Sequence, residues 1–441
     1  MIKRVGVVID FQIYFYLFQP IIQALLNNGF QVNVYCSKEN AKVVHKLFHS
    51  SVGLFVTDLD IIKEKHKLRF MFHRILVLML TRDDFSYQWK KKRYEMTKKY
   101  SGIQGLLLRL SRYLPHVSNA KINGLLRSLI GLNFSNPFKE TNVLVGSLNA
   151  SSHLLCATGI NIYTFMESWD HPVKNPNGYV SDYVFCWNEE LAEDWSLHQY
   201  DKKTITFFPL KLRYALDVVK EQRDTVVKND KVSRRLVYAV ASTDKFSTPT
   251  ICGVERQILR DLAEFTAARG LELHIKPRPN GYVGEFESFR LKYSHVTIGD
   301  VQNLENDQAA DYYYDTKTNE QRFSNVVDAL LVINAFTTFG IDSCVADIPV
   351  LQLDLRHADG YEASNLIYDN YHLKKYLISP EHTIHPEGQS LLEFLSSMNE
   401  ESLLDLASNY KDEIKQTFVP KMSMEEALSV VSEIIENETQ K

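Results

Sequence analysis

The chain has 441 residues, of which 45% are hydrophobic and 12% aromatic, so it is long enough to bury more than one core and we expect two domains. No run of about 18 uninterrupted apolar residues occurs, which argues against a membrane-spanning helix. The opening MIKRVGVVID is too short an apolar run for a signal peptide. Five widely spaced cysteines in apolar contexts predict reduced core thiols in a cytoplasmic protein, with neither a disulfide framework nor a zinc site: Cys36, Cys156, Cys186, Cys252 and Cys344.

The formal net charge of -4 conceals a strongly basic segment. Residues 61–140 contain 17 Lys and Arg against 5 Asp and Glu, a balance of +12, so the rest of the chain carries -16. Leucines and aromatics alternate with these charges, as in RFMFHRILVLML over 69–80. Such basic helices suit either an anionic membrane surface or an ordinary solvated face over core leucines. No recognition motif accompanies the charge, so nucleic acid is not an expected partner.

The first half of the chain predicts a parallel α/β unit. Residues 3–9 form a strand of the buried type, and residues 20–36 predict a helix that ends at Gly29 and a second strand. After the basic insertion the same alternation resumes, which completes one doubly wound half. The later elements are strands over 141–147, 161–167 and 182–188, a helix near 149–158, and the helix NEELAEDWSL.

A second α/β series follows the polar stretch 219–235, which composition marks as a linker. We therefore expect domains over 1–218 and 235–420, with the basic insertion 61–140 in the first and a C-terminal helix over 421–441. The elements of the second series are strands over 235–243, 271–279, 295–301, 331–334 and 350–354, with helices over 254–270, after Thr338 and over 423–437.

The most informative stretch is residues 331–353, where an apolar strand leads through a hydroxyl- and glycine-bearing turn into a short helix. This turn places Thr337, Thr338 and the amides around Gly340 at a helix N-terminus, where unpaired N–H groups and the helix dipole attract phosphate. Asp342 falls early in the same helix. The alternative is a simple helix start, in which a threonine caps and Asp342 complements the dipole.

Cations and hydroxyls end two other strands of the second series. In LELHIKPRPN, Lys276 and Arg278 lie on one face just where the strand finishes. Two cations at a strand's carboxyl end suit a nucleotide phosphate, although surface solvation is the alternative. Ser242 and Thr243 end the first strand of this series and could line the same crevice.

Groups capable of proton transfer gather in FMESWDHP, where a strand ends in Glu167 and is followed by Asp170 and His171. A turn stabilised by Asp170 is the structural alternative.

These motifs resemble those of GT-B glycosyltransferases, a class with two Rossmann-like domains facing a substrate cleft. The chain is most similar to bacterial envelope-polysaccharide enzymes related to CDP-glycerol glycerophosphotransferases and capsule polysaccharide transferases. The resemblance implies an α/β fold of the GT-B type, with the basic helical insertion in the first domain and a closing C-terminal helix that packs back toward that domain. It is carried by the opening strand and helix, FMESWDHP with DYVFCWNEEL, HIKPRPN, and NAFTTFGIDSCVADIPVLQLD.

The resemblance also implies roles for the site residues. Asp342 matches the acidic residue that many GT-B enzymes place near the donor ribose or sugar. Asp170 is the first choice for the base that activates the acceptor, with His171 and Glu167 as alternatives. Asp10, in the first strand-to-helix loop, contacts the acceptor, acts as base, or caps a helix. The donor's nucleotide and phosphates would be bound by Lys276, Arg278, Thr337, Thr338, Gly340 and Asp342, with Ser242 and Thr243 nearby.

We therefore expect a metal-independent glycosyltransferase without a cofactor. It would move a sugar from a nucleotide-activated donor to a cell-envelope polysaccharide or lipid-linked oligosaccharide. We place it in the cytoplasm, at the inner face of the membrane if residues 61–140 bind anionic lipid. The alternatives are a polyol-phosphate transferase of the CDP-glycerol type, a non-hydrolysing nucleotide-sugar 2-epimerase, and a non-catalytic scaffold.

Overall fold

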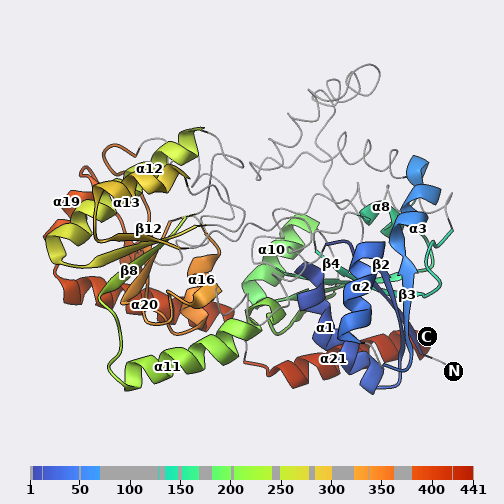
Figure 1. The fold of residues 1–441 in the computed structure, drawn as a ribbon. Coiled ribbons are helices and arrows are strands. Elements are labelled where there is room, and N and C mark those ends of the chain that lie inside the picture. The colour runs from blue at the N-terminus through green and yellow to red at the C-terminus, as the bar shows by residue number, and fades with distance from the viewer. Residues whose placement is uncertain are drawn as a thin grey trace, which may run out of the picture. The chain divides into compact units, whose positions relative to one another are not determined.

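The structure, a computed structural model, divides into two compact units (Figure 1). Unit 1 comprises Met1–Lys211 and Pro420–Lys441, and unit 2 comprises Leu212–Val419. Each unit is built around one parallel sheet. The structure describes residues 3–11, 13–48, 51–69, 128, 135–147, 151–167, 181–199, 203–240, 249–277, 284–299, 322–335, 337–361, 380–419 and 421–440.

The sheet of unit 1 has seven strands in the order β3-β2-β1-β4-β5-β6-β7, all paired in parallel. Its central strands β1 and β4 are almost wholly buried apolar runs, as expected where helices cover both faces of a parallel sheet. The strand order reverses between β1 and β4, which is the switch point of a doubly wound fold. The strands are β1 (Arg4–Ile9), β2 (Gln31–Cys36), β3 (Leu54–Asp58), β4 (Asn142–Gly146), β5 (Asn161–Phe165), β6 (Tyr183–Cys186) and β7 (Lys203–Thr206).

The C-terminal helix of the chain belongs to unit 1 and packs against its first helix (Figure 1). Asn28 donates to the Ser432 hydroxyl at 3.0 Å, and the Tyr183 hydroxyl donates to Glu438 at 2.6 Å. These bonds tie the end of the chain to elements more than 250 residues earlier. The described helices of unit 1 are α1 (Ile13–Asn27), α2 (Lys38–Leu47), α3 (Leu59–Lys65), α8 (Ser152–Leu155), α10 (Glu189–Gln199) and α21 (Met424–Gln440).

The sheet of unit 2 has six strands in the order β10-β9-β8-β11-β12-β13, again all parallel. The order reverses between β8 and β11, so this sheet is doubly wound like the first. The α/β class and the two parallel Rossmann-like sheets are therefore confirmed. The strands are β8 (Arg235–Ala239), β9 (Glu272–Lys276), β10 (Val296–Ile298), β11 (Leu331–Asn334), β12 (Val350–Leu353) and β13 (Thr383–Ile384).

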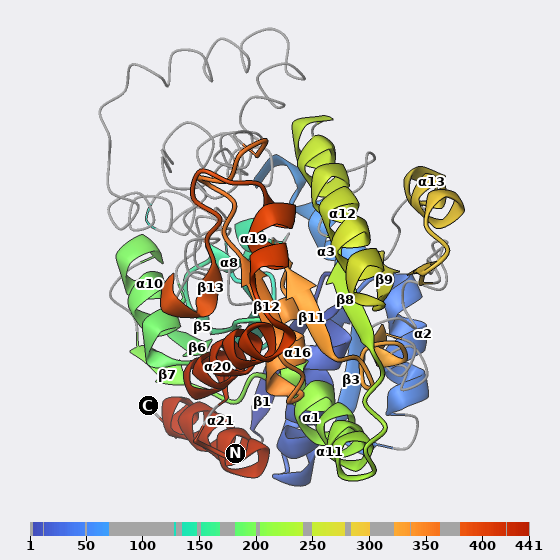
Figure 2. The ribbon, with the colours of Figure 1, turned by 90° about the vertical axis from the view of Figure 1, so that its left-hand side faces the viewer.

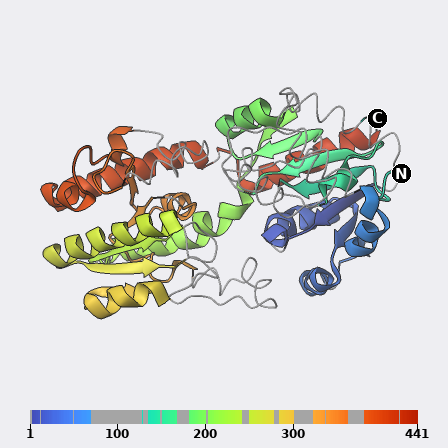
Figure 3. The ribbon, with the colours of Figure 1, turned by 90° about the horizontal axis from the view of Figure 1, so that it is seen from above.

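Long helices cover the second sheet (Figure 2). α12 packs on β9 and on α19, whereas α20 packs on β12 and on α16. Seen from above, α13 lies at the β10 edge of the sheet and α20 lies toward the β12 side (Figure 3). The described helices of unit 2 are a π-helical turn η3 (Ala215–Val219), α11 (Lys220–Lys228), α12 (Pro249–Arg269), α13 (Gly284–Lys292), α16 (Phe339–Val345), a 3-10 turn η5 (Pro380–His382), α19 (Leu391–Ser397) and α20 (Glu400–Phe418).

The stretch 219–235, expected to be a linker, is corrected by the structure. Most of it is the helix α11, which lies inside unit 2. Its charges are largely solvent-exposed, but Arg223 points inward and donates to the carbonyls of Val327 and Ala329, both at 2.9 Å. Composition suggested a linker because most side chains of this helix are polar and exposed. The buried Arg223 that anchors the helix cannot be distinguished from them by composition.

Most of the basic segment 61–140 lies outside the described residues, so its expected helices are not part of this description. Within the described part of the chain, no helix is both long and apolar enough to cross a bilayer. All five cysteines are buried and unpaired with one another.

Alanine at Gly146 is expected to destabilise unit 1. A Cβ there would overlap the ring of Tyr14 in the first turn of α1, so the protein would lose about 1–3 kcal/mol of unfolding free energy, as in other overpacked cores. Urea denaturation measures the loss. Gly253→Ala in α12 is the control, because its Cβ would meet no atom within 4 Å and alanine favours a helix by about 1 kcal/mol. Removing the ring by Tyr14→Ala should cancel most of the cost of Gly146→Ala; simple additivity would contradict this account.

Candidate functional site

Each of the two described sheets has one switch point in its strand order. In doubly wound sheets the ligand-binding crevice lies at the carboxyl ends of the strands that flank the switch point. The flanking strands are β1 and β4 in unit 1, and β8 and β11 in unit 2. Side chains at these two edges are therefore the candidates for chemistry.

Lys276, at the carboxyl edge of unit 2, has no counterion among the described residues. Lys276 is the last residue of β9 and only partly exposed, and its ammonium lies 4.8 Å from the ring centre of Phe339. It forms no ion pair with a residue that the structure describes. Burial, with help from nearby Arg322 and against the effect of Asp342, lowers the pKa of Lys276 to about 7. A desolvated cation is costly unless an anion approaches it.

A second cation contacts the same aromatic ring. The guanidinium carbon of Arg322 lies 5.6 Å from the ring centre of Phe339 and 5.5 Å from that of Phe323. Arg322 also donates to the carboxylate of Asp342, which is buried in α16. Lys276, Arg322, Phe339 and Asp342 thus form one cluster, called here the cation cluster. Its two cations and one carboxylate leave a net positive charge at the sheet edge.

The turn before α16 is built on a buried amide. Asn334, the last residue of β11, donates to Gln352 at 2.7 Å and accepts from the Thr337 amide at 3.2 Å and the Thr337 hydroxyl at 2.9 Å. The same hydroxyl accepts from the amide of Phe339 at 3.1 Å. Thr337 is thus engaged in capping the helix. Thr338 is partly exposed, and its hydroxyl makes no hydrogen bond to a described residue, so it remains available to a ligand.

Gly340 has a structural reason to be glycine. A Cβ at this position would lie 2.6 Å from Nδ2 and 2.7 Å from Cγ of Asn334. The residue therefore lets α16 approach the buried amide of β11. This contact accounts for the glycine, and the expected role of Gly340 in phosphate binding stays a prediction.

In unit 1, Asp10 follows β1 at the switch point and is fully engaged. One carboxylate oxygen accepts from the Ser151 hydroxyl at 2.6 Å and from Lys63 at 2.8 Å, and the other accepts from the Ser151 amide at 3.0 Å. Asp10 thereby joins β1 to α3 and to the start of α8. It caps no amide of α1 in the described contacts.

The other sequence-derived candidates are placed only in part. Glu167, two residues beyond β5, is 7% exposed and so lies in the protein interior. Asp170, His171, Arg278, Ser242 and Thr243 lie outside the described residues. The structure thus brings Lys276 and Asp342 together around Phe339, and sets Thr338 one residue before that ring.

Sequence reasoning missed Arg322, which lies 20 residues before its partner Asp342 and outside every motif. It also missed Asp354 and His385, which meet at 3.1 Å where β12 and β13 end. For Asp354 a signal existed, because an acid that directly follows the apolar strand VLQL has to lie at the carboxyl edge. No grouping of three or more potential metal ligands occurs among the residues described.

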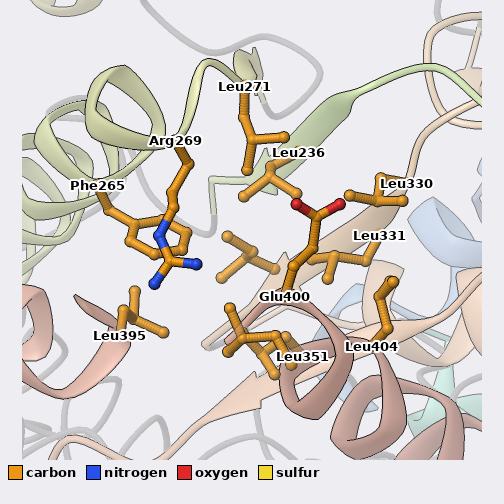
Figure 4. A pocket seen from close by; sticks show the side chains of 12 residues that line it. Leu236, Phe265, Arg269, Leu271, Leu330, Leu331, Leu351, Leu395, Glu400 and Leu404 are labelled. Carbon is orange, nitrogen blue, oxygen red and sulfur yellow. The ribbon is translucent and has the colours of Figure 1, made fainter. Parts of the chain in front are cut away.

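An apolar pocket lies at the opposite end of the second sheet. Leucines from the amino-terminal halves of β8, β11 and β12 point into it, together with Leu271 and side chains from α12, α19 and α20 (Figure 4). The polar groups at its rim already have partners: Arg269 donates to the Met398 carbonyl at 2.6 Å, and Glu400 pairs with Arg234 at 3.1 Å. This pocket offers no chemistry for a charged ligand.

Comparison with known proteins identifies the fold. No protein-family model matches the chain, and no curated protein matches its sequence. A putative UDP-N-acetylglucosamine 2-epimerase from Listeria monocytogenes superposes with a TM-score of 0.50 at 10% identity, over 100% of this chain and 98% of that one. MurG of Acinetobacter baumannii gives 0.41 at 12% identity over 99% of each chain, and the wall teichoic acid polymerase TagF gives 0.47 at 9% identity over 99% and 89%. The architecture is GT-B-like.

Substitution of the two threonines of the turn should lower the unfolding free energy by different amounts. Thr337→Val removes a hydroxyl that donates to Asn334 and caps Phe339, so we expect a loss of about 1–2 kcal/mol in unfolding free energy. Thr338→Val should cost less than about 0.5 kcal/mol, because its hydroxyl has no described partner. Chemical denaturation of both variants tests this contrast. Equal costs would show that the turn is not held by Thr337.

Proposed function

We propose that this chain is a metal-independent glycosyltransferase of the GT-B class. It would transfer a sugar from a nucleotide donor to a cell-envelope polysaccharide or a lipid-linked oligosaccharide, at the inner face of the cytoplasmic membrane. The observation that carries the proposal is the cation cluster, where Lys276 has no carboxylate partner among the described residues at the carboxyl edge of a doubly wound sheet.

The chemistry of the cluster fits a nucleoside diphosphate. Two phosphates bring negative charge that Lys276 and Arg322 can neutralise, and a guanidinium can bind phosphate oxygens through two parallel N–H bonds. The Phe339 ring holds both cations near its face, which is a favourable electrostatic contact. The hydroxyl of Thr338 lies next in sequence to this ring and supplies a further donor.

Asp342 would act first through Arg322. Its buried carboxylate accepts from the guanidinium and so fixes the direction of that side chain before a ligand arrives. The resemblance places an acidic residue near the donor ribose, and Asp342 would serve there through its remaining acceptor capacity.

Acceptor activation would belong to unit 1. Among the four candidates, the carboxylate of Asp10 already accepts from Ser151 and Lys63, so it supports the loop and is poorly placed to take a proton. We therefore keep Asp170 as the base, with His171 and Glu167 as alternatives.

Two other activities would use the same donor site. A polyol-phosphate transferase of the CDP-glycerol type would transfer a phosphate-bearing group. A non-hydrolysing nucleotide-sugar 2-epimerase is favoured by the similar fold of the putative epimerase from Listeria monocytogenes. The epimerase would convert a nucleotide sugar when no acceptor is present, whereas a transferase would not.

Lys276→Ala is expected to weaken binding of a nucleoside diphosphate by about 10- to 100-fold, the usual worth of a hydrogen bond to a charged group. Arg322→Lys keeps the positive charge but cannot make the bidentate contact with phosphate, so we expect a smaller loss of nucleotide affinity. Calorimetry with a panel of UDP, GDP and CDP and their sugar- or polyol-linked forms measures both. Lys231→Ala is the control, since this exposed lysine precedes β8 at the other edge of the sheet.

In the same panel, Asp170→Asn should keep donor affinity and lose turnover. Unchanged nucleotide affinity in the Lys276 and Arg322 variants would reject the assignment of the donor site.

Nucleotide affinity should also fall as pH rises. The pKa of Lys276 is lowered to about 7, so its charge is present below pH 7 and lost above it. Bound phosphates favour the charged form, and affinity should therefore drop by up to tenfold per pH unit from pH 7.5 to 9. The terminal phosphate of the nucleotide is already ionised in this range. Lys276→Met should abolish the slope, and a slope that survives in this variant would assign it to another group.

A further inference from the structure

A second group of charged residues lies at the carboxyl edge of unit 2, where β12 and β13 run side by side (Figure 2). Asp354 directly follows β12, and His385 directly follows β13. The Asp354 carboxylate is 1% exposed and accepts from Nδ1 of His385 at 3.1 Å and from Nε of Arg356 at 2.9 Å. None of these three residues belongs to the cation cluster.

The ionised carboxylate of Asp354 determines which ring nitrogen of His385 carries a proton. Although burial opposes it, hydrogen bonds from His385 and Arg356 hold the pKa of Asp354 well below its usual range, so this carboxylate is ionised and can only accept. Nδ1 of His385 must therefore carry a proton. In the neutral ring, the lone pair is then on Nε2.

Nε2 of His385 is the ring nitrogen that does not contact Asp354. The atom is buried and has no hydrogen-bond partner in the described part of the chain, although 28% of the side chain is exposed. A buried acceptor without a donor costs about 1–3 kcal/mol, so Nε2 itself adds no stability to the fold. Arg356 already neutralises Asp354, and the histidine is therefore not required to balance its charge.

We infer that Nε2 of His385, oriented by Asp354, accepts a hydrogen bond from a hydroxyl of a sugar or polyol ligand. The inference rests on the proposed function and names a further ligand-binding residue for it. The ammonium of Lys276 lies over the ring of Phe339, which follows β11, and β11 is two strands from β13, about 10 Å at about 4.8 Å per strand. In a nucleotide sugar the sugar is joined directly to the diphosphate, so a ligand whose phosphates contact Lys276 can extend its sugar or polyol toward His385.

Two substitutions separate ligand binding from structural support. His385→Asn keeps an N–H that can donate to Asp354 but removes the acceptor at Nε2. His385→Gln reaches further and can place an amide oxygen close to the Nε2 position. Thermal unfolding of both variants checks that the fold is retained.

Calorimetry with UDP, UDP-N-acetylglucosamine, CDP and CDP-glycerol tests the inference. We expect His385→Asn to bind the sugar- or polyol-linked nucleotide about tenfold more weakly than the natural protein does. Its affinity for the nucleoside diphosphate alone should change less than twofold, and His385→Gln should recover part of the loss. If only a glycan acceptor shows the loss, the hydroxyl belongs to the acceptor.

Other results of the same measurements would overturn the inference. Equal weakening of the linked and free nucleotides, or no weakening of linked nucleotide or acceptor in His385→Asn, would overturn the role of His385 and leave the donor site standing. If the natural protein binds no member of the wider panel of UDP, GDP and CDP and their linked forms, the proposed function fails and this inference fails with it.

Discussion

The candidate site of unit 2 depends on one buried hydrogen bond between neighbouring strands. Asn334 of β11 donates to Gln352 of β12 at 2.7 Å, and both side chains are fully buried. Neither amide can be left unpaired in the core, so the second end of Asn334 has to be satisfied by the turn that follows β11. Thr337 meets that need, and Gly340 allows α16 to approach. The positions of Phe339 and Asp342 follow from where this helix starts.

The cation cluster is the opposite case, because its charges are not balanced within the described protein. Two cations contact the ring of Phe339, but only Arg322 has a carboxylate partner. The depressed pKa of Lys276 shows that the folded protein disfavours the ammonium there. A fold tolerates such a residue when binding supplies the missing charge, and perturbed groups of this kind concentrate at functional sites. An anionic ligand would stabilise the charged form of Lys276 at the end of β9.

The sequence predicted the core strands well and the site only partly. Strands such as β1, β4, β8 and β11 are buried on both faces, so each appears as an uninterrupted apolar run. The edge strands β3 and β7 are half exposed and carry no such pattern, and they were missed. At the site, spacing revealed the turn at Thr337 but could not tell whether its hydroxyl faces a ligand or Asn334. Arg322 reaches the cluster through tertiary folding alone, which periodicity does not encode.

The described polar groups at the carboxyl edges of the two sheets differ in how completely they are satisfied. In unit 1, the carboxylate of Asp10 accepts from Lys63 of α3 and from Ser151 at the start of α8, and Gly146 lies under the ring of Tyr14. In unit 2, Lys276 is left without a carboxylate among the described residues, and Nε2 of His385 is left without a donor. A ligand gains most free energy where it replaces contacts that the protein lacks. We therefore propose that the charged and hydroxyl-bearing parts of a donor bind to unit 2, whereas Asp10 of unit 1 holds the start of α8 in place.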